Sequence, residues 1–230
     1  LRLSMVDARG VRWSSQALLH ADAEGVADVA EAGAERGSSY QGVDATGLFW
    51  SMQPDGGQGV PLPFPARHSD DGLLYRPAEF VVEAYEGERR IGVQTVRRWL
   101  SAPGVRAERL RIPGVVAHLY LPPGAREDGR RRPLVITLGG AEGGIEAADA
   151  YAAWLASNGY LAVALAYYRM PGLPSDLVAV PVDPVATALD WLQRQPFVDP
   201  QRMAAMGGSW GGIVALAAAA HDPRLRAVVS

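Results

Sequence analysis

The sequence predicts an α/β domain built on a parallel sheet, preceded by a region that contains β structure alone. Three observations lead to this prediction. Residues 1–100 hold runs of alternating apolar and polar residues and no helical period. From residue 101 onward, short continuous apolar runs alternate with helical patterns, which is typical of parallel strands covered on both faces. One of these strand-to-helix steps carries a serine flanked by glycines, Ser209.

The N-terminal region is predicted to form antiparallel strands. They are expected over residues 1–5, 11–19, 26–29, 80–85 and 91–99. The first two surround a turn at 7–10, which is typical of a hairpin. Residues 33–76 are expected to form loops, because proline and glycine are frequent there. A small antiparallel sandwich satisfies this pattern. Since the chain begins inside an alternating pattern, we expect its N-terminal end to be cut.

Residues 101–230 are predicted to form the α/β domain. Strands are expected over 105–112, 115–121, 134–138 and 161–166, and helices over 145–158 and 184–193. The strand and helix around Ser209 follow them. The last four residues read as the start of another strand, so we expect the domain to be truncated after the helix that follows Ser209.

Composition and charge exclude several functions. The net charge of −3 gives no broad basic surface for nucleic acid. The absence of cysteine excludes disulfides, thiolate metal sites and a cysteine nucleophile. The longest apolar runs are far shorter than the ~20 residues that span a bilayer. We therefore expect a soluble, cytoplasmic protein without metal or cofactor; its oligomeric state is left open, and a C-terminal peroxisomal signal cannot be judged.

The segment Gly207–Gly211 fits the pattern G-x-S-x-G, the nucleophile elbow. In this motif the serine occupies a strained turn between a strand and a helix, so its neighbours must lack a Cβ for the two elements to approach. The turn places the serine hydroxyl at a helix N-terminus, which favours negative charge. A glycine-rich connection without chemistry is the alternative. The predicted strand before and helix after Ser209 favour a nucleophile, and with it an α/β-hydrolase fold.

The loop after the 134–138 strand contains four glycines between Gly139 and Gly144. A phosphate-binding loop would need Lys and Ser or Thr where Ile145 and Glu146 stand. In an α/β-hydrolase the corresponding loop supplies one oxyanion-hole N–H, and the residue after the nucleophile supplies the other. We assign these to Gly140 and Trp210. A flexible turn is the alternative for the loop.

A serine nucleophile needs a base, and this fold places Asp or Glu and then His after the serine. Among His, Asp and Glu residues, only His221 and Asp222 follow Ser209 in this chain. They lie at the far end of the helix, ~18 Å away at 1.5 Å per residue. The other histidines, His20, His68 and His118, are interpreted as structural or solvated. The triad Asp and His are therefore expected beyond Ser230, and this chain alone is expected to be inactive.

The whole chain resembles the acyl-CoA thioesterase and bile acid-CoA:amino acid N-acyltransferase family (BAAT). The resemblance is carried by Ser39–Asp44, Gly47–Pro54, Gly104–Arg106, Leu119–Pro123, Gly159–Tyr160, Val163–Tyr168 and the elbow. It implies an immunoglobulin-like β-sandwich over 1–100, of which the first strands are expected to be missing, and a hydrolase domain over 101–230. In this family the nucleophile is serine in the thioesterases and cysteine in the amino-acid-conjugating transferase, so Ser209 favours hydrolysis.

The resemblance implies an acyl-CoA thioester hydrolase that releases free fatty or related acid and coenzyme A through a Ser209 acyl-enzyme. Coenzyme A is then part of the substrate. Arg130, Arg131 and Arg132 either meet its phosphates or belong to a solvated loop. The alternatives are an amino acid N-acyltransferase, a serine peptidase or esterase with an elbow resembling that of prolyl oligopeptidases, and a non-catalytic hydrolase-fold module.

Overall fold

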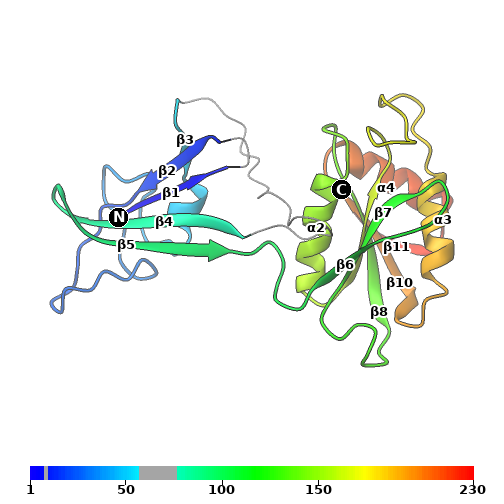
Figure 1. Cartoon of the computed structure of the whole chain (residues 1–230), viewed down its shortest axis with the longest axis horizontal. Helices are drawn as coiled ribbons and strands as arrows, with labels where there is room; N and C mark the ends of the chain where they lie inside the picture. The colour runs from blue at the N-terminus through cyan, green and yellow to red at the C-terminus, as the bar shows by residue number, and fades with distance from the viewer. Residues whose placement is uncertain (8–9, 57–76) are drawn as a thin grey trace. The chain divides into compact units, whose positions relative to one another are not determined.

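The computed structural model describes residues 1–7, 10–56 and 77–230, which divide into two units (Figure 1). The N-terminal unit ends at Trp99 and the C-terminal unit runs from Leu100 to Ser230. The division falls one residue before the domain boundary that the sequence predicts. His68 and the proline-rich part of the predicted loop lie outside the described residues.

The N-terminal unit is built on one antiparallel sheet with the strand order β3-β2-β1-β4-β5. Its strands are β1 (Arg2–Val6), β2 (Arg12–Gln16), β3 (Gln53–Pro54), β4 (Ala78–Glu86) and β5 (Arg89–Arg98). The predicted hairpin is confirmed, because Met5 of β1 pairs with Trp13 of β2. Alternate side chains of these two strands are buried, as period-2 patterning requires, and they form a core with Tyr40 and Leu48.

Two sequence predictions for this unit are wrong in detail. The strand expected over Val26–Val29 is a loop, because the Asp22 carboxylate accepts the N–H groups of Glu24 and Val26 at 3.0 and 2.8 Å and holds a turn there. The region expected to be loop contains the short helix α1 (Gly47–Trp50) as well as β3. The described residues of this unit form a single sheet, so the sandwich stays a prediction.

The C-terminal unit is a six-stranded sheet with the order β11-β10-β8-β9-β7-β6. Its strands are β6 (Arg106–Arg109), β7 (Val116–Leu121), β8 (Arg132–Leu138), β9 (Leu161–Ala166), β10 (Val198–Gly207) and β11 (Leu225–Val229), and its helices are α2 (Glu146–Ser157), α3 (Asp183–Leu192) and α4 (Trp210–His221). Strands β8 to β11 are parallel, whereas β6 and β7 are antiparallel. These elements confirm the predicted α/β architecture.

Both faces of this sheet are covered, which explains the continuous apolar strands. Helix α2 lies on one face and α3 on the other (Figure 1). All six residues of β9 are buried. Since β8, β9 and β10 are parallel, the loops that follow them leave the sheet at one edge, and that edge holds the predicted site.

Candidate functional site

Ser209 lies between the end of β10 at Gly207 and the start of α4 at Trp210. Its backbone has φ +53° and ψ −123°, a conformation that costs a non-glycine residue free energy. The residue is exposed and its side chain does not cap the helix. The strand, sharp turn and helix are those that the nucleophile elbow requires.

Two glycines allow the elbow to form. A Cβ on Gly207 would lie 2.2 Å from the carbonyl carbon of Gly211, so only glycine lets the strand and helix approach this closely. A Cβ on Gly211 would lie 2.3 Å from the carbonyl oxygen of Gly139 and 2.6 Å from that of Leu138. Gly211 therefore brings the first turn of α4 against the glycine-rich loop that follows β8.

The Tyr167 hydroxyl, just beyond β9, anchors that loop. It donates to the carbonyl oxygens of Gly139 at 2.7 Å and Gly140 at 3.3 Å. The Tyr168 hydroxyl reaches Gly140 O at 3.4 Å. Burial, followed by the nearby Tyr168 and Glu142, raises the pKa of Tyr167 to about 12, so its hydroxyl remains a proton donor. The Gly139 C=O and the Gly140 N–H belong to one trans peptide and point in opposite directions. The anchor on the Gly139 carbonyl therefore also directs the Gly140 N–H.

The Gly140 N–H donates to Glu142 Oε1 at 2.7 Å. A Cβ on Gly140 would lie 2.7 Å from Glu142 Oε2 and 3.4 Å from Ser209 Cβ, so the carboxylate and the serine flank the same small space. The structure thus brings Gly140 next to Ser209, and it places an acidic side chain on the N–H that the sequence assigns to an oxyanion.

Trp210 is the first residue of α4, and its N–H has no acceptor within the helix. The next two N–H groups, those of Gly211 and Gly212, bond to the carbonyls of Gly208 and Ser209 at 2.9 and 3.0 Å. The Trp210 N–H therefore needs an acceptor outside the helix, and its assignment to the oxyanion hole stays a prediction.

Each of the described histidines is engaged with another group. His221 Nδ1 bonds to Ala217 O at 2.8 Å, at the opposite end of the 12-residue helix α4. His20 belongs to the N-terminal unit and pairs with Glu35 at 2.8 Å. His118 is buried on β7, and its Nδ1 lies 2.8 Å from Asp149 Oδ1 of α2. Strand β7 is three positions from β10 in the sheet, or ~14 Å at the usual strand spacing.

The arginines Arg130–Arg132 lie at the other edge of the sheet. Arg132 begins β8, pairs in register with Val198, and its guanidinium binds the Asp128 carboxylate. Six residues of β8 lie between Arg132 and Gly139, and the seven residue steps correspond to a strand length of ~23 Å. Within this unit, the placement favours the solvated-loop interpretation over a phosphate contact near Ser209.

Sequence reasoning missed three residues that shape the site: Glu142, Tyr167 and Tyr168. The tyrosines directly follow a buried strand at the carboxyl edge of a parallel sheet, a position where polar side chains often serve a site. Glu142 is the charged residue inside the glycine-rich loop.

In the part of the chain that the structure describes, no three His, Asp or Glu side chains gather in a way that could hold a metal ion. No helix among these same residues is long and apolar enough to cross a membrane.

Comparisons with known proteins agree with the motifs. Residues 1–112 match the family model described as the acyl-CoA thioester hydrolase/BAAT N-terminal region, and residues 175–230 match that of the prolyl oligopeptidase family. Acyl-coenzyme A thioesterase 1 of Rattus norvegicus is 32% identical over 232 residues, which cover 100% of this chain and 52% of that protein. Bile acid-CoA:amino acid N-acyltransferase of Mus musculus is 29% identical over 231 residues, which cover 100% of this chain and 53% of that protein.

These matches confirm the family resemblance, and the chain spans about half the length of the curated relatives it matches. Among solved structures, an esterase of Pyrobaculum calidifontis aligns with a TM-score of 0.42 and 28% identity, over 50% of this chain and 39% of the esterase. The names of other relatives include a mitochondrial and a peroxisomal thioesterase, so the cytoplasmic location stays a prediction.

Proposed function

Because this chain is similar along its whole length to acyl-CoA thioesterases and to bile acid-CoA:amino acid N-acyltransferase, we propose that it carries the nucleophile and oxyanion-binding loop of an acyl-CoA thioester hydrolase. The observation on which this depends is the exposed Ser209, held at φ +53° beside the glycine-rich loop. The match of residues 1–112 also supports an immunoglobulin-like sandwich as a proposal for the N-terminal unit.

In the proposed reaction, Ser209 Oγ attacks the thioester carbonyl and loses its proton to a base. The carbonyl oxygen becomes negatively charged and accepts the N–H groups of Trp210 and Gly140, each typically worth ~10²–10³ in rate. The C–S bond then breaks and coenzyme A leaves. A thiol with a pKa near ~8.5 is a good leaving group, so protonation of the sulfur matters less than protonation of a departing amine. Water hydrolyses the acyl-serine and releases the acid.

The base and its orienting carboxylate are proposed to be a His and an Asp of the full-length protein other than the described His and Asp residues of this chain. The placements of His118 and His221 support this proposal, since each is engaged with another group at a distance from the elbow. The chain by itself is accordingly proposed to be inactive.

A second candidate is transfer of the acyl group to an amino acid. The 29% identity to the N-acyltransferase supports it, because that relative is also matched along the whole chain. A peptidase is supported only over residues 175–230, which contain the elbow. The serine at position 209 favours hydrolysis over transfer.

The test uses the full-length protein and a long-chain acyl-CoA, with and without glycine or taurine. Thiol release is followed colorimetrically and the acyl product by mass spectrometry. We expect free acid, and we expect Ser209→Ala to lower the rate by ~10⁴–10⁶. Ser175→Ala, a serine in a surface turn bonded to Asp176, is the control that should retain activity. Amide product would favour the transferase, and activity retained in Ser209→Ala would refute the assignment.

A further inference from the structure

We propose that the Glu142 carboxylate is a built-in competitor for the oxyanion site, which the reacting substrate has to displace from the Gly140 N–H. The proposal rests on the proposed function, because it concerns the N–H that would stabilise the negative charge formed when Ser209 attacks. It adds a residue that sets how readily that N–H becomes available.

The contact itself has the features of an occupied anion site. Glu142 Oε1 accepts the Gly140 N–H at 2.7 Å, the distance of a charge-assisted hydrogen bond. The other oxygen, Oε2, and Ser209 Cβ lie 2.7 and 3.4 Å from the position of a Cβ on Gly140. A negatively charged oxygen therefore already bonds to the N–H beside the nucleophile. An oxyanion needs the same donor, so the two anions exclude each other.

The surroundings allow the carboxylate to leave while the N–H stays in place. Glu142 is an exposed residue, whereas Gly139 and Gly140 are buried and their carbonyls are held by the Tyr167 hydroxyl. The side chain can thus move without the loop. The exposed guanidinium of Arg169 already reaches the Glu142 carbonyl oxygen at 3.4 Å, which gives the released carboxylate a nearby cation.

The strength of the competitor depends on its charge. A hydrogen bond to a charged acceptor is roughly twice as strong as one to a neutral acceptor. Glu142→Gln keeps the shape and an acceptor oxygen but removes the charge. It should therefore release the N–H more easily and accelerate formation of the charged intermediate on the order of tenfold.

The experiment measures the rate at which a fluorophosphonate modifies Ser209 in the full-length protein, followed by intact-mass spectrometry and peptide mapping. The phosphonyl oxygen of this probe requires the same N–H donors as an oxyanion. We expect Glu142→Gln to react roughly tenfold faster than the wild type and to show a similar gain in kcat/KM for acyl-CoA. Glu142→Asp should also react faster, because the shorter side chain withdraws its charge from the N–H.

The matched control is Glu146→Gln, which removes the same charge four residues later, at the first residue of α2, where Glu146 Oε2 accepts the Ile145 N–H at 3.0 Å. We expect its phosphonylation rate to stay within about twofold of the wild type, far below the tenfold gain that a 1.36 kcal/mol change would produce. An equal gain in Glu142→Gln and Glu146→Gln would show that removing any nearby negative charge accelerates the reaction, and it would overturn the proposal. An unchanged or slower rate in both Glu142 variants would make the carboxylate a loop-positioning group and overturn it as well.

The failure of the proposed function has a different signature. If fluorophosphonate does not modify Ser209 in any variant, the serine is no nucleophile, and the competitor loses its role with it. If Ser209 is modified at the same rate in the wild type and the Glu142 variants, the nucleophile stands and only the competitor is refuted.

Discussion

The Tyr167 hydroxyl donates a 2.7 Å hydrogen bond to the carbonyl of Gly139, which lies 28 residues earlier in the chain. It connects the end of β9 to the loop after β8. Because the Gly139 carbonyl and the Gly140 N–H belong to one peptide unit, this bond fixes the direction of the proposed oxyanion donor.

Tyr167→Phe is therefore expected to lower kcat for acyl-CoA in the full-length protein by about 10- to 100-fold, since misplacement of a catalytic group by ~1 Å has effects of this size. KM should change little, because the hydroxyl contacts the loop and not the substrate. Removing the donor to a buried carbonyl should also lower the free energy of unfolding by about 1–3 kcal/mol.

Tyr168→Phe is the matched control, because its hydroxyl makes only a 3.4 Å contact with Gly140 O in the same loop. We expect a change in kcat of less than about threefold, corresponding to less than 0.7 kcal/mol. Equal effects of the two substitutions would contradict the positioning role of Tyr167. Steady-state kinetics and urea unfolding of the two variants measure both quantities.

Gly211→Ala should disrupt the contact between α4 and the glycine-rich loop. The new Cβ would meet the Gly139 and Leu138 carbonyl oxygens at 2.3 and 2.6 Å, and backbone atoms cannot yield without moving the loop. We expect a loss of stability of about 1–3 kcal/mol or more, with loss of activity.

Gly208→Ala, three residues away, provides the comparison. Its Cβ would meet only the Tyr151 side chain, with the hydroxyl at 3.0 Å and Cζ at 3.9 Å, and this end of the side chain can shift. We expect the free energy of unfolding, measured by urea titration, to fall much less than in Gly211→Ala. Equal losses of stability in the two variants would contradict the explanation that the Gly211 contact with the Leu138 and Gly139 carbonyls is what excludes a side chain there.

The strongly patterned parts of this chain were predictable from the sequence. Continuous apolar runs fixed β8 and β9, and the glycine cluster located the elbow between β10 and α4. In contrast, the strand expected at Val26–Val29 fails because Asp22 forms a local turn, which residue periodicity does not report.

The role of Glu142 was not predictable, because it arises from a hydrogen bond whose geometry depends on the folded loop. The anchor at Tyr167 was missed for a related reason. The Tyr167 hydroxyl bonds to the backbone carbonyl of Gly139, 28 residues earlier. Every residue has a backbone carbonyl, so the pattern of side chains in the sequence does not indicate which one accepts this bond.

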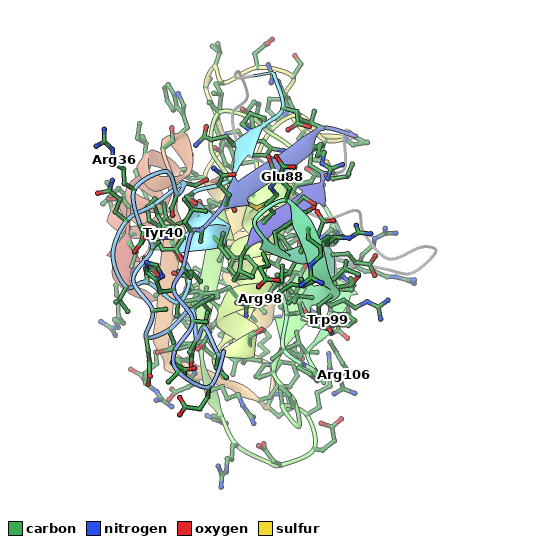
Figure 2. The ribbon with its side chains drawn as sticks, turned by 90° about the vertical axis from the view of Figure 1, so that its left-hand side faces the viewer. Arg36, Tyr40, Glu88, Arg98, Trp99 and Arg106 are labelled. Carbon is green, nitrogen blue, oxygen red and sulfur yellow. The ribbon has the colours of Figure 1, made fainter. Side chains whose placement is uncertain are left out.

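In the N-terminal unit, Gly47 lies under the ring of Tyr40, which is labelled in Figure 2 and comes from the loop before α1. A Cβ on Gly47 would lie 2.3 Å from ring carbon Cε2, and the ring is 4% exposed and held in the core. We expect Gly47→Ala to destabilise this unit by about 1–3 kcal/mol.

Gly92→Ala in β5 is the control for Gly47→Ala. Its Cβ would make an ordinary 3.9 Å contact with Ala84, and alanine costs less entropy than glycine in a strand. Thermal unfolding should show a lower midpoint for Gly47→Ala and an unchanged or higher one for Gly92→Ala. Similar midpoints in the two variants would refute the steric explanation.

The pair formed by Asp128 and Arg132 predicts a pH effect at the start of β8. The Arg132 guanidinium, followed by the Arg130 N–H, lowers the pKa of Asp128 from 3.8 to about 2. A group whose pKa is lower in the folded state stabilises that state above its unfolded pKa and loses this contribution as pH falls through the folded value. The contribution should therefore disappear between about pH 4 and pH 2.

Carbon-detected NMR of the Asp128 carboxyl measures this pKa directly. In Arg132→Gln the same carboxyl should titrate closer to 3.8, because the charged donor is gone. In Asp128→Asn the unfolding midpoint should depend less steeply on pH over this interval. An Asp128 that titrates at its ordinary value in the wild type would contradict the ion pair.

Substitutions of Ser209 should measure the free-energy cost of its strained backbone conformation. At φ +53° and ψ −123° a side chain crowds the backbone, and such conformations cost of order 1–3 kcal/mol. Glycine adopts them without strain, although it gains up to about 1 kcal/mol of entropy in the unfolded chain. Ser209→Gly and Ser209→Ala both lack the hydroxyl and should both be inactive, but the glycine variant should be more stable by about 0.5–2 kcal/mol. Urea unfolding of the two variants measures this difference. A glycine variant no more stable than the alanine variant would show that the backbone at Ser209 is unstrained, and the serine would then lose the structural feature that supports its role as a nucleophile.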